Sequence, residues 1–172
     1  GGFNALVAIA DVSFYVRPGS QLDREARMRG NSVYFPDRVV PMLPEILSAD
    51  VCSLKEGEDR AAMACHMHIN ADGKVSSFRF TRALVRIAHN IAYEEAQKAV
   101  DSGTPPEHLA NLWDAWKALS AARDARDPLA LELPERRVVL NEKGEIAEIA
   151  IRERLDAHRV VEDFMIAANV AA

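Results

Sequence analysis

Two alternating segments on either side of a tight turn constrain the fold more than any other feature of this chain. Ala62–Ile69 and Val75–Ile87 flank the segment Asn70–Lys74, which reads NADGK. The Asp-Gly pair supplies residues that accept positive φ, and alternation of apolar and polar residues is typical of half-buried strands. The pattern therefore predicts a long antiparallel hairpin in the middle of the chain.

The first third of the chain combines a strand, a helix and a long connection. Asn4–Ala10 (NALVAIA) is a continuous apolar run, which predicts a buried strand. Ser20 can cap a helix over Leu22–Arg29, and Gly30 stands where such a helix would end. Asn31–Leu54 carries three prolines and no clear period, so we expect an ordered but irregular connection. A connection of this length is usually functional.

The rest of the chain mixes helices with a second hairpin, so the predicted fold class is mixed α and β. We expect one domain over residues 1–172, truncated at both ends, because the last helix runs into Ala172 without a stop signal. The predicted elements are a helix over Tyr93–Val100, a helix opened by Pro105-Pro106, strands at Arg137–Leu140 and Glu145–Ile151, and a helix from Asp156.

Composition narrows the class of protein. Hydrophobic residues make up 49% and charged residues 27%, as in ordinary globular proteins. No apolar run approaches the roughly 20 residues that cross a bilayer. Gly1–Asn4 has neither the basic leader nor the apolar stretch of a signal peptide, and Cys52 and Cys65 form no CxxC pair. We therefore expect a cytoplasmic protein with reduced thiols. The net charge of -5 argues mildly against nucleic acid, although local charge decides inside a narrow channel.

Asp11 and Tyr34 are the candidate site residues, and each has two interpretations. A carboxylate at the end of a strand, such as Asp11, can be a metal ligand or catalytic acid, or it can cap the following turn. Tyr34 and Phe35 precede Pro36, and an exposed ring there can stack on a base for ~1–3 kcal/mol. The alternative is that the ring packs beneath the loop. Residue type alone favours the cap and the packed ring.

Two other groups of side chains, a histidine pair and an acidic segment, are weaker candidates for a functional site. His66 and His68 lie on one face of a predicted strand at a spacing that metal sites use, but no third ligand is apparent, which favours a structural or surface role. The acidic segment Glu56–Asp59 is expected to be a solvated turn rather than a cation site. The chain has no GxSxG, GxxxxGK or GxGxxG motif.

Several longer runs carry a family resemblance, which is densest in the first 60 residues. The runs are Leu6–Ser13, Val16–Ser20, Leu22–Ala26, Arg29–Pro44, Leu47–Ser48, Cys52–Leu54, Glu58–Arg60, Arg154–Arg159 and Met165–Asn169. In them the chain resembles the catalytic (RNB) domain of the ribonuclease R and ribonuclease II family of 3'-5' exoribonucleases. The resemblance implies part of an RNB-type domain, with a mixed or antiparallel sheet and packed helices.

The resemblance also implies an activity: processive, magnesium-dependent hydrolysis of single-stranded RNA to nucleoside 5'-monophosphates, which fits a two-metal scheme. The family's catalytic aspartates belong to a DxxxxxDxDD motif upstream of the strand that ends at Ala10, and that motif is absent here. No catalytic residue and no metal ligand carry over to this sequence. We therefore expect the parent protein to be an enzyme and the isolated chain to be inactive.

One binding residue does carry over. Tyr34 matches the family tyrosine that stacks on the base at the RNA 3' end, and Asp11 is expected near the metal cluster without being a motif aspartate. A second stacking aromatic would fall near Leu129–Leu131, where the sequence has leucine, and it stays unassigned.

Two alternatives remain open for the isolated chain: a non-catalytic RNA-binding module, or an interaction module that self-associates. Self-association is expected because Val160, Val161, Phe164 and Ile166 form an apolar face that truncation leaves bare. Whether the parent is of the ribonuclease R or the ribonuclease II type, and so whether it degrades structured RNA, also stays open.

Overall fold

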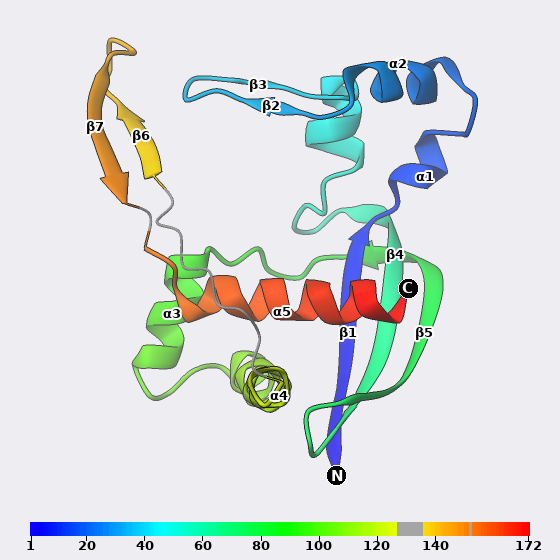
Figure 1. Ribbon diagram of the computed structural model, residues 1–172, viewed down its shortest axis with the longest axis vertical. Coiled ribbons are helices and arrows are strands. Elements are labelled where there is room, and N and C mark those ends of the chain that lie inside the picture. The colour runs from blue at the N-terminus through cyan, green and yellow to red at the C-terminus, as the bar shows by residue number, and fades with distance from the viewer. Residues whose placement is uncertain (127–135, 152) are drawn as a thin grey trace.

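The computed structural model describes residues 1–126, 136–151 and 153–172. Its strands form three separate antiparallel sheets, with helices packed on one side of the largest sheet (Figure 1). This is the mixed α and β class that the sequence predicts. The elements in order are β1 (Gly2–Ala10), α1 (Val12–Tyr15), α2 (Gln21–Arg29), β2 (Val33–Tyr34), β3 (Val39–Val40), η1 (Ile46–Val51), β4 (Asp59–Asn70), β5 (Val75–Arg86), α3 (Tyr93–Asp101), α4 (Glu107–Asp124), β6 (Arg136–Leu140), β7 (Ile146–Ile151) and α5 (Asp156–Ala171).

The central hairpin of β4 and β5 is confirmed. Each strand has 12 residues, so β4 extends beyond the predicted Ala62–Ile69, whereas β5 ends one residue before the predicted Ile87. Strand β1 pairs with β4, so the sheet order is β1-β4-β5. The turn requires glycine at position 73. Gly73 has φ 74°, and a Cβ there would collide with the carbonyl oxygen of Ala118 in α4. The turn is thus also a contact between the sheet and the helices.

Helices α4 and α5 build the core against one face of this sheet. Cys65, Met67 and Ile69 of β4 are buried beneath Trp113 and Trp116 of α4, together with residues of α5. Because side chains alternate across a strand, only every second residue of β4 joins this core. The two indole rings meet edge to face with centroids 6.4 Å apart. The helical spacing of apolar residues in the sequence thus correctly predicted α4.

Three sequence predictions need correction. Strand β1 is not buried, because it lies at an edge of the sheet and its residues alternate between exposed and half-buried. The segment Asn31–Leu54 is not irregular throughout, since it contains β2, β3 and the single-turn π-helix η1. The apolar face of α5 is only partly bare. Val160 and Phe164 are buried in the core, whereas Val161 and Ile166 are 41% and 47% exposed.

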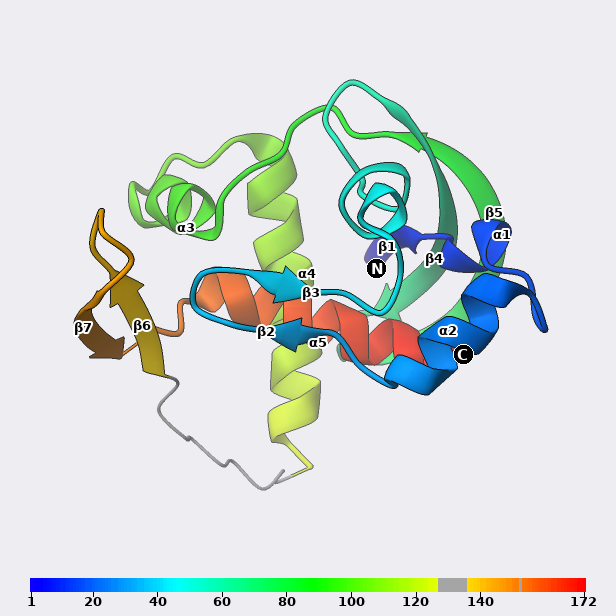
Figure 2. The same ribbon diagram turned by 90° about the horizontal axis from the view of Figure 1, so that it is seen from above.

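The segment between β1 and β4 forms a unit of its own beyond the end of β1. Ser20 caps the start of α2 because its hydroxyl accepts the N–H of Asp23, and Gly30 with φ 75° follows the last helical residue, as predicted. The β2–β3 hairpin then overhangs α5 (Figures 1 and 2). Among the described residues, no helix is long and apolar enough to span a membrane.

Candidate nucleic-acid interface

Asp11 occupies the junction between β1 and α1. It is 5% exposed, and it caps α1 by accepting the N–H of Phe14 at 3.2 Å. The hydroxyl of Ser13 donates to the same carboxylate oxygen at 2.6 Å, and the Asp11 N–H donates to the carbonyl of Ala61 in β4 at 2.9 Å. The capping role, one of the two sequence interpretations, is therefore observed. Proximity to a metal cluster stays a prediction.

Arg82 of β5 completes this junction, and sequence reasoning missed it. Its Nε lies 3.1 Å from Asp11 Oδ2, and its guanidinium donates to the hydroxyl of Ser13 at 2.9 Å. Both partners are about 70 positions away in the sequence, so no local pattern could have revealed the contact. The arrangement ties the start of the α1–α2 unit to the far strand of the sheet. Burial raises the pKa of the nearby Cys52 thiol, and the negative charge of the Asp11 carboxylate raises it further.

Tyr34 is presented on the β2–β3 hairpin. Its side chain is 77% exposed, so the ring does not pack beneath the loop. The neighbouring Phe35 is held instead: its N–H donates to the carbonyl of Arg38 at 2.8 Å, and the Arg38 guanidinium lies 4.7 Å from the Phe35 ring. The hairpin therefore fixes one aromatic and leaves the other exposed. That the Tyr34 ring binds an RNA base stays a prediction, and no described contact joins Tyr34 to Asp11.

The two histidines and the acidic turn have local partners. His68 Nδ1 lies 3.0 Å from the side-chain oxygen of Asn4, and His66 Nε2 lies 3.4 Å from the Thr81 hydroxyl. In the acidic turn, Glu56 accepts the N–H of Asn90 at 2.8 Å, and Asp59 pairs with Arg86. All four residues of the turn are exposed, in agreement with the expected solvated turn, and the turn also bonds to other segments.

The described residues do not fit a magnesium ion by themselves. No group of three or more His, Cys, Asp or Glu side chains among them could hold a metal. Both oxygens of Asp11 are already engaged by Ser13, Phe14 and Arg82. The predicted second stacking position, Leu129–Leu131, lies outside the described residues.

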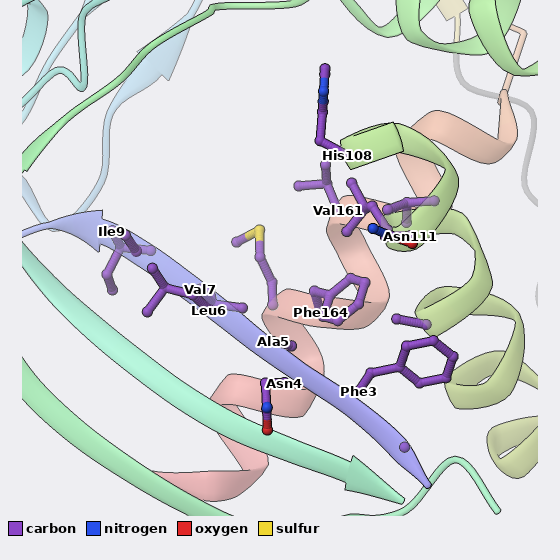
Figure 3. Close-up of a pocket in the computed structure, with 16 residues that line it drawn as sticks. Phe3, Asn4, Ala5, Leu6, Val7, Ile9, His108, Asn111, Val161 and Phe164 are labelled. Atoms are coloured by element: carbon purple, nitrogen blue, oxygen red, sulfur yellow. The ribbon is translucent and has the colours of Figure 1, made fainter. Parts of the chain in front are cut away.

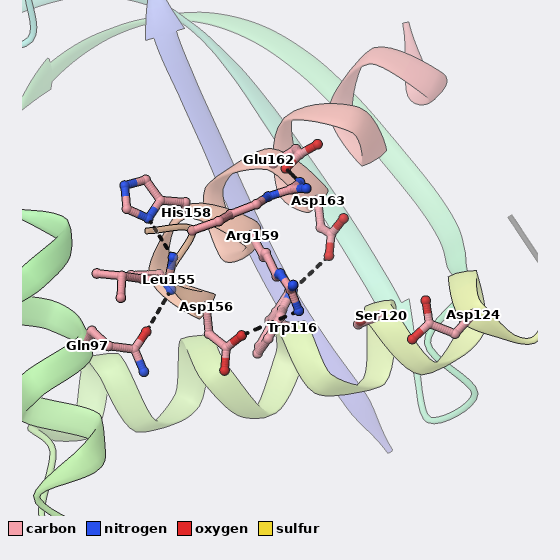
Figure 4. A network of polar contacts seen from close by, with 12 residues as sticks. Gln97, Trp116, Ser120, Asp124, Leu155, Asp156, His158, Arg159, Glu162 and Asp163 are labelled. Atoms are coloured by element: carbon pink, nitrogen blue, oxygen red, sulfur yellow. Dashed lines mark hydrogen bonds and ion pairs between the residues drawn. The ribbon is translucent and has the colours of Figure 1, made fainter. Parts of the chain in front are cut away.

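A polar network anchors the start of α5 (Figure 4). Gln97 of α3 accepts the N–H of Ala157 at 3.0 Å, and His158 Nδ1 accepts the N–H of Leu155 at 3.2 Å. The His158 ring also stacks on Tyr93 of α3, with centroids 4.3 Å apart. These contacts satisfy N–H groups that a helix start leaves without partners. The network therefore fixes α5 relative to α3.

A groove of about 690 Å³ runs between β1 and the two core helices (Figure 3). Phe3, Ala5 and Val7 line it from the strand, and Val161 and Phe164 line it from α5. It follows the edge of β1 that has no partner strand among the described residues. Figure 3 shows a mainly apolar lining, which suits a peptide segment better than a charged ligand.

Comparison with solved structures places this arrangement of elements in a known class. The chain superposes on ribonuclease R from Mycoplasma genitalium in complex with ribose-methylated single-stranded RNA, with a TM-score of 0.86 and 29% identity. The superposition covers 98% of this chain and 27% of that protein. The fold is therefore that of part of a ribonuclease R catalytic region.

Sequence comparison identifies the family. The RNB domain model matches residues 1–172, so the chain belongs to the RNB domain family. It is 41% identical over 180 residues to ribonuclease R of Vibrio parahaemolyticus and 39% identical over 180 residues to that of Escherichia coli. Both matches cover 100% of this chain but only 22% of the relative. The family resemblance noted from the sequence is thereby confirmed.

Proposed function

We propose that this chain is part of a 3'-to-5' exoribonuclease that hydrolyses single-stranded RNA to nucleoside 5'-monophosphates. Membership of the RNB family supports the activity. The observation that supports the role of this chain is the ring of Tyr34, which is 77% exposed on strand β2, next to the loop of a hairpin that overhangs α5. In this proposal the ring stacks on the base at the RNA 3' end and holds the terminal nucleotide in place.

The chemistry requires groups that this chain lacks. We propose that the parent enzyme is magnesium-dependent and that its metal ligands belong to a part of the protein preceding β1. Asp11 then lies near the reacting phosphate as a structural carboxylate, with its charge balanced by Arg82. A cytoplasmic location belongs to the same proposal, in keeping with the two free cysteines.

An activity assay on two proteins tests this proposal. The isolated chain is expected to release no mononucleotides from labelled oligoadenylate with magnesium or manganese. The parent enzyme is expected to release them with magnesium and to stop when the metal is chelated. Metal-dependent release by the isolated chain, or a parent enzyme without 3'-end activity, contradicts the proposal.

We also infer that the isolated chain self-associates. The exposed side chains Leu6 and Ile9 stand on β1, at 59% and 54% exposure, beside the apolar groove. An edge strand without charged residues is a template for pairing with another strand. A second copy that pairs through β1 would cover both the strand edge and the groove.

A further inference from the structure

The face of the three-stranded sheet that points away from α4 and α5 has no role in the proposed catalysis. Because Cys65 and Met67 point into the core, the intervening His66 and His68 point to the opposite face. The register places Arg79 directly beside His66. We call this surface the outer sheet face; its members are Asn4, Leu6, His66, His68, Ser77, Arg79 and Thr81.

This sheet is basic although the chain as a whole is acidic. The strands β1, β4 and β5 contain four arginines, two histidines and one acidic residue, Asp59, in a chain of net charge -5. Arg60, Arg82 and Arg86 each pair with a carboxylate. Arg79 has no ion pair or hydrogen bond within the part of the chain that the structure describes. Its charge is therefore available to an anionic ligand, and no strand residue on this face opposes it.

The two imidazole rings beside Arg79 are held in place before any ligand binds. The contact of His68 with Asn4 and that of His66 with Thr81 each cross from one strand to the next. A hollow of about 330 Å³ includes these rings, Arg79 and Leu6, which is 59% exposed. Groups that are already oriented lose little freedom on binding, so such a surface is suited to recognition.

We propose that the outer sheet face binds single-stranded RNA. Arg79 contacts a phosphate, the rings of His66 and His68 stack on bases, and Leu6 provides apolar contact. Open antiparallel sheets that carry ring side chains bind single strands in this way, and histidine is one of the rings that stack on bases. An acidic protein surface could pair with the Arg79 guanidinium but would not stack on the two imidazole rings. Single-stranded RNA could contact both kinds of side chain, so it fits this face better. The site is separate from Tyr34, and its test does not depend on hydrolysis.

Binding of a fluorescent oligoadenylate to the chain without divalent metal tests this proposal. Arg79→Gln is expected to weaken binding. The slope of the logarithm of the binding constant against the logarithm of the salt concentration should also become shallower by about 0.7, because one phosphate contact to a single strand contributes that amount. Arg137→Gln on β6 is the matched control, since it removes the same charge from another exposed strand position, and it should leave both values unchanged. His66→Ala should weaken binding at least about fivefold with an unchanged salt slope, and His66→Phe should restore it.

Three outcomes overturn the proposal. Arg79→Gln and Arg137→Gln could have equal effects, His66→Phe could bind as weakly as His66→Ala, or polyglutamate could displace the RNA as effectively as unlabelled RNA. Thermal melting of each variant identifies any that do not fold. In that case photo-crosslinking of 4-thiouridine RNA to the unchanged chain decides. Crosslinks in the β4 peptide that contains His66 and His68 support the proposal, and crosslinks confined to the Tyr34 peptide contradict it.

Discussion

The indole Nε1 of Trp116 donates a hydrogen bond of 2.8 Å to Asp163 Oδ2, and it joins α4 to α5 inside the core. Asp163 is 4% exposed and Trp116 is 8% exposed. The Arg123 guanidinium pairs with the other oxygen of the same carboxylate. A buried carboxylate is tolerated when both of its oxygens have hydrogen-bond or ion-pair partners. The burial of Asp163 therefore requires Trp116 and Arg123, and each of these loses a partner if Asp163 is removed.

Removing this carboxylate should destabilise the fold. Asp163→Ala leaves the Trp116 N–H without its partner, and we expect a loss of about 2–3 kcal/mol in the free energy of unfolding, less than for a fully buried pair because Arg123 is partly exposed. Asp114→Ala is the control, since Asp114 forms an exposed ion pair with Lys117 and should cost about 0.5 kcal/mol or less. Urea denaturation measures both. Equal losses in the two variants would show that the buried network adds no more to the free energy of unfolding than an exposed ion pair does.

The junction between Asp11 and Arg82 predicts a difference between two arginines of β5. Arg82→Gln breaks an ion pair with a carboxylate that is 4% exposed, whereas Arg86→Gln breaks a pair with the half-exposed Asp59. We expect Arg82→Gln to cost about 1 kcal/mol and Arg86→Gln about 0.5 kcal/mol or less. Thermal melting gives the comparison. A larger effect at Arg86 would contradict the role assigned to Asp11.

Acid should weaken the start of α2. The Gly19 N–H and the Arg27 side chain lower the pKa of Asp23, so its carboxylate stabilises the folded state at neutral pH. Because the folded pKa is the lower one, this contribution is present above the unfolded pKa and disappears as the pH falls through the folded pKa. The Tm difference between the unchanged chain and Asp23→Asn should therefore stay constant down to about pH 5 and shrink as the pH falls from there to about pH 2. A constant difference over that range would be inconsistent with this assignment.

Self-association through β1 should respond to a charge on that strand. Ile9→Lys places an ammonium group at the strand edge, which opposes pairing with a second strand, so we expect a shift toward monomer. Ile146→Lys on β7 is the control because Ile146 is also largely exposed, at 66%. Sedimentation over a concentration series measures both. A chain that is already monomeric at every concentration, or an equal shift in the control, would count against this interface.

The elements with local signals were predictable from the sequence. The β4–β5 turn and the caps at Ser20 and Gly30 depend on residues a few positions apart, and both are observed as expected. The edge position of β1 was missed because an apolar run does not reveal how many partner strands it has.

The contacts that join distant segments, in the core and at the Asp11 junction, were not predictable. Trp116 and Asp163 are 47 residues apart, and Arg82 and Ser13 are 69 apart, so only the folded chain brings them together. Tyr34 was identified through the family resemblance, whereas its residue type alone favoured a packed ring.

The most direct test of the proposed function is a comparison of Tyr34→Ala and Tyr34→Phe in the parent enzyme. Stacking requires the ring but not the hydroxyl, and losing it costs ~1–3 kcal/mol of binding. We expect alanine to slow the reaction and change the length of the final product, with little change in Tm because the ring is exposed, and we expect phenylalanine to restore function. Product ladders and melting curves are measured for both variants. An alanine variant with a lowered Tm and a normal product ladder would mean that Tyr34 stabilises the fold and does not hold RNA.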